Sequence, residues 1–264
     1  MIMYQKSSDL KDSAKGHLTG RYYNTVMTCL LSSTLMLFIS QSAVTLTTSL
    51  ENTIYRLTGA SQELPAVSVL SYVLLLLASI LCNIFYAGLA LFFLNIACNR
   101  SATVFDLFYG FQQQLGKTFL ISGALTLLRT VCMLPVDIGL YLYAQNRTIP
   151  GNLLRYLAGA LLLGMLIYIP VSLALSQSFY LMLDFPDYGA LDTMKLSMRI
   201  MKGHKKRLFY IEVSFLPLIF LSALTLGIGS LWLTPYRNTT YALFFLDIMK
   251  PEQQTHSSTS NIRS

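Results

Sequence analysis

Charged residues are scarce in this sequence: they make up 12% of its 264 residues, about half the share usual in soluble domains. Apolar residues make up 54%, and the mean hydropathy is +0.54. This composition excludes a disordered chain and a coiled coil. It also argues against a soluble enzyme, because one domain of this length cannot hide so much apolar surface. About six membrane spans of roughly 22 residues would account for it.

The sequence also lacks the residue patterns of metal sites and of common catalytic sites. Its four cysteines include no Cys-x-x-Cys pair, and its three histidines lie far apart along the chain. It contains no Gly-x-Ser-x-Gly motif and no His-Glu-x-x-His motif. We therefore expect no metal, no cofactor and no enzymatic activity, and we interpret the cysteines as small residues that pack between helices.

The net charge of +7 arises from 19 Lys and Arg against 12 Asp and Glu. These basic residues stand between apolar runs rather than on an element that could read a nucleic-acid groove. The charge therefore favours anionic phospholipid as a partner, with other membrane proteins as a second possibility and no nucleic acid.

The pattern of uncharged runs predicts an all-α fold, a polytopic transmembrane helical bundle formed by a single integral-membrane domain over residues 1–250. We expect about six spans, with five as the alternative. The expected spans lie near residues 24–48, 67–95, 118–142, 156–183, 208–225 and 230–248.

Two parts of this pattern leave room for interpretation. The uncharged run 64–99 is longer than a bilayer requires, so we expect it to be tilted, kinked or partly interfacial, with Asn83, Gly88 and Asn95 as candidate points of irregularity. Residues 208–249 fit either a hairpin that turns at 226–229 or one long span ending near Pro235 and followed by an interfacial helix.

Both ends of the chain differ from its apolar centre. Within residues 1–21, Leu10, Ala14 and Leu18 recur every four residues, which is typical of an amphipathic helix that lies on a membrane surface. The segment 251–264 is polar, and we expect it to be disordered.

The distribution of Lys and Arg predicts the orientation. Cytoplasmic loops carry an excess of these residues, and both span counts place the N-terminus in the cytoplasm. The six-span interpretation gives the stronger asymmetry and places both termini there.

Several motifs together resemble a known family. The motifs include 179–187 (FYLMLDFPD), 201–205 (MKGHK), 227–233 (GIGSLWL), 240–245 (TYALFF), 16–20 (GHLTG) and 105–111 (FDLFYGF). In order and spacing they resemble the bacterial integral-membrane family catalogued as domain of unknown function nine-seven-five. The resemblance spans nearly the whole chain and implies a multi-pass protein of the bacterial cell membrane, with no assigned reaction. The family is distantly similar to the membrane domains of some glycerophosphodiester phosphodiesterases, which hints at phospholipid biology.

A basic segment between the fourth and fifth expected spans is the main candidate for a binding site. Cations recur at helical spacing within it, beside an apolar stripe that contains three methionines, and Gly203 suits the left-handed position that ends a helix. The candidate lipid-binding or partner-binding residues are Lys195, Arg199, Lys202, Lys205, Lys206 and Arg207. The alternative is that this loop only fixes the topology.

Ionisable side chains within spans are the second group of candidates, because they are costly in a membrane and often serve a function. Arg129 and Asp137 lie on one expected span, and Glu212 lies one turn inside another, where Arg207 or Lys206 could neutralise it. Pro135 and Pro170 stand in similar short sequences, and paired helix breaks can mark the substrate site of a transporter. These residues support the alternative of a small transporter or channel component.

Overall fold

The computed structural model describes residues 4–59, 65–146 and 152–260, and every regular element within these ranges is a helix. The elements are α1 (Ser7–Leu18), α2 (Tyr22–Thr58), α3 (Pro65–Ala97), η1 (Val104–Phe108), α4 (Tyr109–Gln112), α5 (Leu115–Asn146), α6 (Leu153–Leu175), α7 (Ser178–Asp184), α8 (Ala190–Ile200), α9 (Lys205–Leu224) and α10 (Ser230–Ser260). The predicted all-α class is confirmed.

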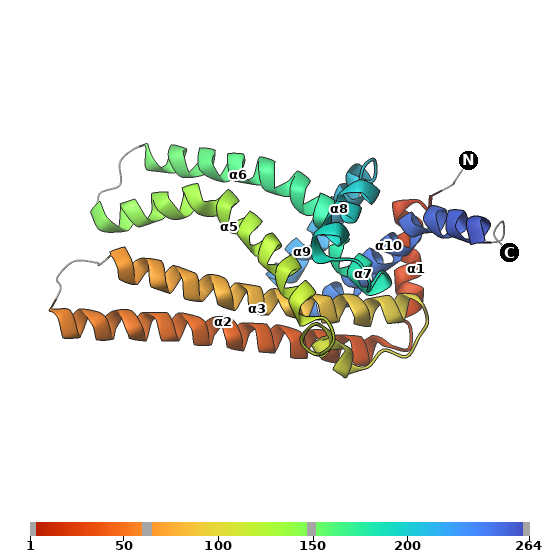
Figure 1. The fold of residues 1–264 in the computed structure, drawn as a ribbon, viewed down its shortest axis with the longest axis horizontal. Coiled ribbons are helices and arrows are strands. Elements are labelled where there is room, and N and C mark those ends of the chain that lie inside the picture. Colours follow the sequence, from red (N-terminus) through yellow and green to blue (C-terminus); the bar gives the residue numbers. More distant parts are fainter. Residues whose placement is uncertain (1–3, 60–64, 147–151, 261–264) are drawn as a thin grey trace.

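Two long helical hairpins dominate the shape. The pair α2 and α3 and the pair α5 and α6 extend to one side of a cluster of shorter helices (Figure 1). Five segments are long and apolar enough to cross a membrane: Tyr22–Thr58, Ala66–Ala97, Leu115–Leu140, Leu153–Asp184 and Lys205–Leu224. Large apolar side chains point outward along them, with Phe38 of α2 71% exposed and Leu166 of α6 72% exposed. The chain is therefore a multi-pass membrane protein.

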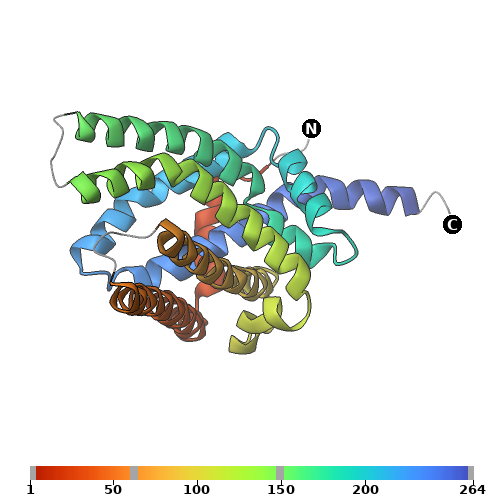
Figure 2. The same cartoon turned by 60° about the vertical axis from the view of Figure 1, so that its left-hand side comes forward.

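Residues 208–249 could form a hairpin or one long span, and the structure has the hairpin, formed by the last two described helices. Helices α9 and α10 diverge from a tight turn, which Figure 2 shows from the side. Leu226 and Gly227 both have positive φ in this turn, 54° and 87°. Glycine adopts this backbone conformation without steric cost, so Gly227 suits the turn.

Helix α10 is not among the five apolar segments, because polar and charged residues interrupt it. Its inner face nevertheless supplies much of the core, since Phe244, Phe245, Ile248 and Met249 are each at most 4% exposed. They pack with residues of α3, α7 and α9 in the principal hydrophobic cluster. Helix α10 is thus a core helix that returns the chain to the end where α1 lies (Figure 1).

The N-terminal amphipathic helix differs from its predicted position. Leu10, Ala14 and Leu18 of α1 are at most 1% exposed, because this stripe packs mainly against α10 rather than on lipid. Lys11 reaches over the same interface, with its ammonium 4.4 Å from the ring centroid of Phe215 in α9. Its partial burial and the neighbouring Lys15 lower the pKa of Lys11. A stripe that looks suited to lipid is here covered by protein.

Helix α3 runs as one helix through all three predicted points of irregularity. Gly88 allows a close approach: a Cβ at this position would lie 2.0 Å from the backbone oxygen of Leu107 in η1. Asn95 donates a hydrogen bond to Asp106 at 3.1 Å. Gly88 and Asn95 thus attach the η1 segment to α3 instead of bending the helix.

The opposite end of the chain also differs from the prediction. Helix α10 continues to Ser260, into the segment 251–264 that we expected to be disordered. Extending an existing helix needs no new nucleation, which is the costly step. The last part of that segment, residues 261–264, lies outside the described residues.

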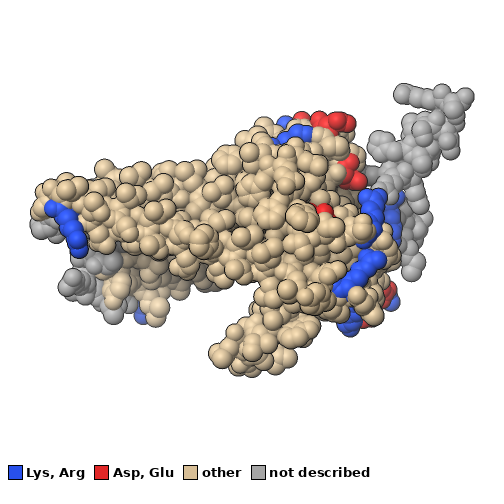
Figure 3. Space-filling model, turned by 90° about the horizontal axis from the view of Figure 1, so that it is seen from below, with Lys and Arg blue, Asp and Glu red and all other residues tan. Residues whose placement is uncertain are grey.

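Charged side chains concentrate at the two ends of the molecule. In Figure 3 the Lys and Arg residues form a band at the end that carries α1 and α8, and a smaller group marks the opposite end. On the face shown, the surface between them is largely uncharged. This distribution matches a bilayer around the middle of the molecule.

Candidate functional site

The predicted basic segment folds into α8, the turn that follows it and the first turn of α9. Lys195, Arg199, Lys202 and Lys206 are exposed and Lys205 is half-buried. These five residues form what we call the basic surface. Only Lys195 has an acidic partner in the described structure, Asp192 at 4.0 Å, and both side chains are largely exposed. Such exposed pairs contribute little, so the cations of this surface are available to a ligand.

Apolar side chains flank the basic surface. Leu191 is 69% exposed and Met198 is 44% exposed, whereas Met201 is fully buried in the core. The predicted methionine stripe is therefore shared between the outside and the core. Gly203 has φ 98°, in agreement with the predicted left-handed position.

Helix α8 is held in place by a buried hydrogen bond. The Ser197 hydroxyl donates to the backbone oxygen of Ala174 at 2.8 Å. Ala174 lies at the end of α6, where the break before α7 leaves carbonyl groups without helical partners. Ser197 thus orients the basic surface relative to the spans.

Arg207 differs from the other predicted cations. Its guanidinium donates to Asp247 of α10 at 2.6 Å, and these two side chains are only 17% and 2% exposed. It also donates to the backbone oxygen of Gln5. This cation connects α9, α10 and the N-terminal segment, and we assign it to the core rather than to the basic surface.

Asp247 is the centre of this network and was missed by the sequence analysis. Besides Arg207, it accepts hydrogen bonds from Lys250 at 3.2 Å and from the backbone N–H of Gln5 at 3.2 Å. In the sequence, Asp247 is marked only as an acid inside the apolar run 243–249. Its main partner, Arg207, lies 40 residues away, so sequence spacing does not indicate the pair.

The structure does not bring Arg129 and Asp137 together. Asp137 accepts a hydrogen bond from the Tyr72 hydroxyl of α3 at 3.4 Å. Among the ion pairs of the described residues, none includes Arg129 or Asp137. Arg129 and Asp137 thus form no ion pair with each other in the described structure.

Glu212 has a different neighbour from the one expected. Arg207 turns to Asp247 instead, and Glu212 of α9 lies beside Tyr241 of α10. The expected neutralisation of Glu212 by Arg207 is thus wrong. Lys206 makes no ion pair with it in the described structure either.

The two prolines do not break their helices. Pro135 lies inside α5 and Pro170 inside α6, and both helices continue past them. The Tyr156 hydroxyl of α6 donates to the backbone oxygen of Pro135 at 3.0 Å, which satisfies a carbonyl near the proline. Unwound segments of the transporter type are absent from the described parts of α5 and α6.

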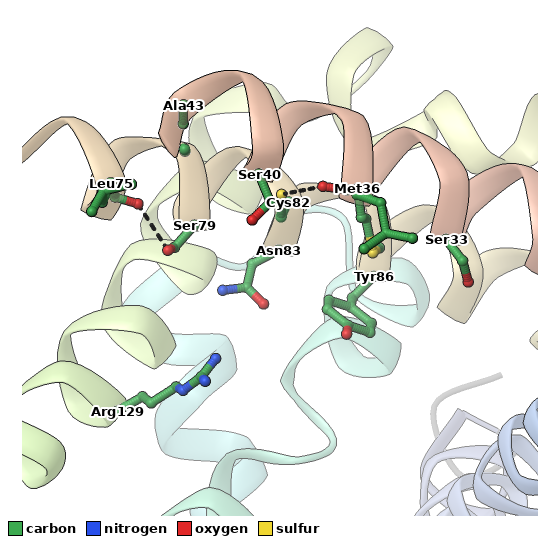
Figure 4. A pocket seen from close by; sticks show the side chains of 12 residues that line it. Ser33, Met36, Ser40, Ala43, Leu75, Ser79, Cys82, Asn83, Tyr86 and Arg129 are labelled. Carbon is green, nitrogen blue, oxygen red and sulfur yellow. Dashed lines mark hydrogen bonds between the residues drawn. The ribbon is translucent and has the colours of Figure 1, made fainter. Parts of the chain in front are cut away.

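Two adjoining cavities meet at Arg129. One, of about 530 Å³, lies between α2 and α3, and the other, of about 400 Å³, reaches α6 and α10. Asn83, Tyr86 and Arg129 line both, and Figure 4 shows Arg129 of α5 extending toward Asn83 of α3. We call the two together the arginine cavity.

A second arginine, Arg237 of α10, lines the smaller part of this cavity. The sequence shows Arg237 as a charge inside the last apolar segment but gives no hint that it shares a cavity with Arg129, 108 positions earlier. The sequence could indicate each arginine separately, because a charge inside a membrane is costly. It could not indicate that both line one cavity, because that depends on how α10 packs.

The described residues contain no group of three His, Cys, Asp or Glu side chains that could hold a metal ion. All four cysteines are free, and Cys29 and Cys132 are buried.

Comparison with known proteins gives one match. A family model described as "Protein of unknown function (DUF975)" matches residues 1–252. No curated protein and no solved structure matches the chain. The distant similarity to membrane domains of glycerophosphodiester phosphodiesterases therefore stays a prediction.

Proposed function

The chain belongs to the DUF975 family of proteins of unknown function, and from that premise we propose a function based on its geometry. The protein is a non-enzymatic component of the bacterial cell membrane that binds anionic phospholipid at its cytoplasmic face through the basic surface. The observation that carries this proposal is the exposure of neighbouring cations beside exposed apolar side chains on one helix at the end of the spans.

The positions of these side chains suit the surface of a bilayer. Lys195 and Arg199 lie one helical turn apart on α8 and are exposed, so both can reach lipid phosphates. Leu191 and Met198 can enter the boundary between head groups and acyl chains. Each cation near an anionic surface contributes about 1 kcal/mol, so the basic surface favours lipids with a net negative charge.

The proposed orientation follows from the charges at the two ends. The basic surface, Lys6, Lys11 and Lys15 gather near α1 and α8, whereas Arg56 and Arg155 are the described basic residues at the far ends of α2 and α6. The positive-inside rule assigns the more basic end to the cytoplasm. The N-terminus is accordingly cytoplasmic in this proposal.

A pair of matched double variants tests the lipid proposal. Lys195→Gln with Arg199→Gln removes two cations of the basic surface, and Arg56→Gln with Arg155→Gln removes two exposed cations at the opposite end. Phosphatidylglycerol and neutral phosphatidylcholine are titrated into the detergent-solubilised protein, and bound lipid is counted by native mass spectrometry. We expect the first variant to bind phosphatidylglycerol about 30-fold more weakly, which corresponds to about 2 kcal/mol.

Two results would contradict the proposal. One is equal binding of phosphatidylglycerol and phosphatidylcholine by the unchanged protein. The other is an equal loss in both double variants. If phosphatidylglycerol binding is unchanged but an acidic membrane protein stops co-purifying with the first variant, the basic surface is a site for a protein partner instead.

A small transporter or channel component is the second candidate function, and the arginine cavity is the observation that favours it. Arg129 stands about 21 Å along α5, counted from Leu115 at 1.5 Å per residue. A polar cavity at this depth could pass a solute. Anion flux into liposomes that contain the purified protein, lost in Arg129→Gln, would support transport. If liposomes that contain the protein show no anion flux, this second candidate function is excluded.

A further inference from the structure

The arginine cavity is partly open between the long helices, polar and apolar side chains line it together, and Arg129 is exposed. Arg129 and Asn83 each lie near the middle of a helix of more than 30 residues. The wall on the side of α2 and α3 carries the hydroxyls of Ser33, Ser40 and Ser79 (Figure 4). The wall toward α6 and α10 carries Tyr168, Ser172 and Asn238. Polar side chains therefore line part of a space in a region that is otherwise apolar, although Ser79 and Ser172 donate their hydroxyl protons to backbone oxygens.

Two guanidinium groups line the smaller part of this cavity. Arg237 contributes a half-buried side chain whose Nε is buried and has no hydrogen-bond partner. Its guanidinium carbon lies 5.8 Å from the ring centroid of Tyr241, which fixes it against one wall. Arg129 enters from α5. The Nε atom of Arg237 is covered by protein, so a ligand in the cavity would meet the parts of the two guanidinium groups that line it.

The charge of the cavity is not balanced by its walls. None of the residues that line either part is acidic. The ion pairs of the described structure include neither Arg129 nor Arg237. Glu212, which lies beside Tyr241, offsets at most one of the two positive charges. Because an unpaired cation is expensive within a membrane, the cavity calls for an anion.

We infer that the arginine cavity is a binding site for an oxyanion of the phosphate class, held by Arg129 and Arg237. The planar guanidinium group donates two parallel hydrogen bonds to a phosphate, which is the arrangement that this ligand favours. The Asn238 amide, the Tyr168 hydroxyl and the second N–H of the Asn83 amide, whose first N–H donates to Thr126, can donate to its remaining oxygens. A cation would be repelled by both arginines, and a neutral solute would leave their charge uncompensated.

This chemistry has two sources, free phosphate and the phosphodiester of a membrane lipid. The experiment therefore has two arms. Binding of radiolabelled inorganic phosphate to the purified, detergent-solubilised protein is measured by equilibrium dialysis. Retention of phosphatidylglycerol, a phosphodiester lipid, is measured by native mass spectrometry of the same preparations.

The variants are Arg129→Gln and Arg237→Gln, with Arg155→Gln as the matched control. Arg155 is an exposed arginine near the start of α6 and is absent from both parts of the cavity. We expect each cavity variant to bind its oxyanion at least tenfold more weakly than the unchanged protein, because a charge-assisted hydrogen bond is lost. The control should bind within twofold of the unchanged protein.

A loss confined to the phosphate arm assigns a free oxyanion, and a loss confined to the lipid arm assigns a lipid phosphodiester. Either supports the inference. Equal binding in the cavity variants and in Arg155→Gln, in both arms, overturns it. The inference is also overturned if the unchanged protein binds neither inorganic phosphate nor the lipid.

Two further variants keep the test decisive if a glutamine variant does not fold. Arg129→Lys and Arg237→Lys keep the charge but lose the fork of donors, so we expect binding between that of the unchanged protein and that of the glutamine variants. The Lys195→Gln, Arg199→Gln protein should keep its phosphate binding, since the basic surface lies outside the cavity. Loss of phosphate binding in that variant would contradict a separate site.

Discussion

At the scale of single residues, Asp247 connects the two ends of the sequence. It receives Arg207, Lys250 and the backbone of Gln5 while only 2% of its side chain is exposed. Removing one partner of a buried ion pair leaves the other charge uncompensated, and this costs more than the pair itself contributes.

We therefore predict that Asp247→Asn destabilises the protein by about 3 kcal/mol. The measurement is reversible unfolding in mixed micelles, followed by circular dichroism. Asp192→Asn is the control, because its ion pair with Lys195 is exposed on both sides and should change stability by less than about 1 kcal/mol. Similar effects of the two changes would show that Asp247 is not a structural centre.

His204 makes stability in this region depend on pH. Its ring lies 4.6 Å from the ring of Tyr4, between centroids. Burial and the neighbouring Arg207 lower its pKa, while Asp247 raises it in part. Its pKa in the folded protein is thus below the ordinary value of 6.5, and the unfolded chain takes up the proton first as the pH falls.

The contribution of His204 to stability is consequently complete above pH 6.5 and is lost as the pH falls toward its lower folded-state pKa. We predict that the unfolding temperature falls between pH 7.5 and pH 5, and that His204→Gln removes part of this fall. Parallel curves for the variant and the unchanged protein would exclude His204 as a cause.

At the scale of the elements, close backbone contacts determine how η1 sits on α3. The backbone oxygen of Leu107 occupies the place where a side chain at position 88 would begin. Gly164 of α6 makes a similar approach to α5, since a Cβ there would lie 2.4 Å from the backbone oxygen of Cys132. Small residues at such contacts let membrane helices pack closely.

We predict that Gly88→Ala costs about 1–3 kcal/mol, because the added carbon forces η1 away from α3. Gly116→Ala is the matched control, since a Cβ at position 116 meets no atom within 4 Å. The control should be neutral or slightly stabilising, because alanine favours a helix. The measurement is thermal unfolding of both variants in the same detergent. Equal losses of stability in the two variants would show that the close contact at Gly88 does not matter for stability.

The elements were predictable from the sequence to different degrees. Uncharged runs bounded by basic residues indicated the long helices, since composition alone sets which segments can enter a membrane. The position of α1 was not predictable, because the stripe of Leu10, Ala14 and Leu18 fits a lipid surface and a protein surface equally well. The pair of Arg207 and Asp247 and the shared cavity of Arg129 and Arg237 depend on α10, whose polar residues weaken its apolar pattern.

At the scale of the whole molecule, the number of apolar helices gives a misleading topology. Five crossings would leave the two ends of the chain on opposite sides of the membrane. Helix α10 instead returns to the end where α1 lies, and the two helices pack together (Figure 1). The termini therefore belong on the same side.

Reporter fusions can test this topology. We predict that green fluorescent protein fused after Ser264 is fluorescent and that alkaline phosphatase at the same place is inactive, as for a cytoplasmic end. Fusions after Thr58, at the end of α2, should give the reverse. Active phosphatase after Ser264 would show that α10 does not return.

The contact between α1 and α10 has a consequence for how the protein is made. Helix α1 leaves the ribosome well before α10, the partner that covers Leu10, Ala14 and Leu18. The nascent chain must therefore keep an uncovered apolar stripe until α10 is synthesised, with the membrane surface as a temporary place for it. A product that ends before α10 would leave this stripe uncovered.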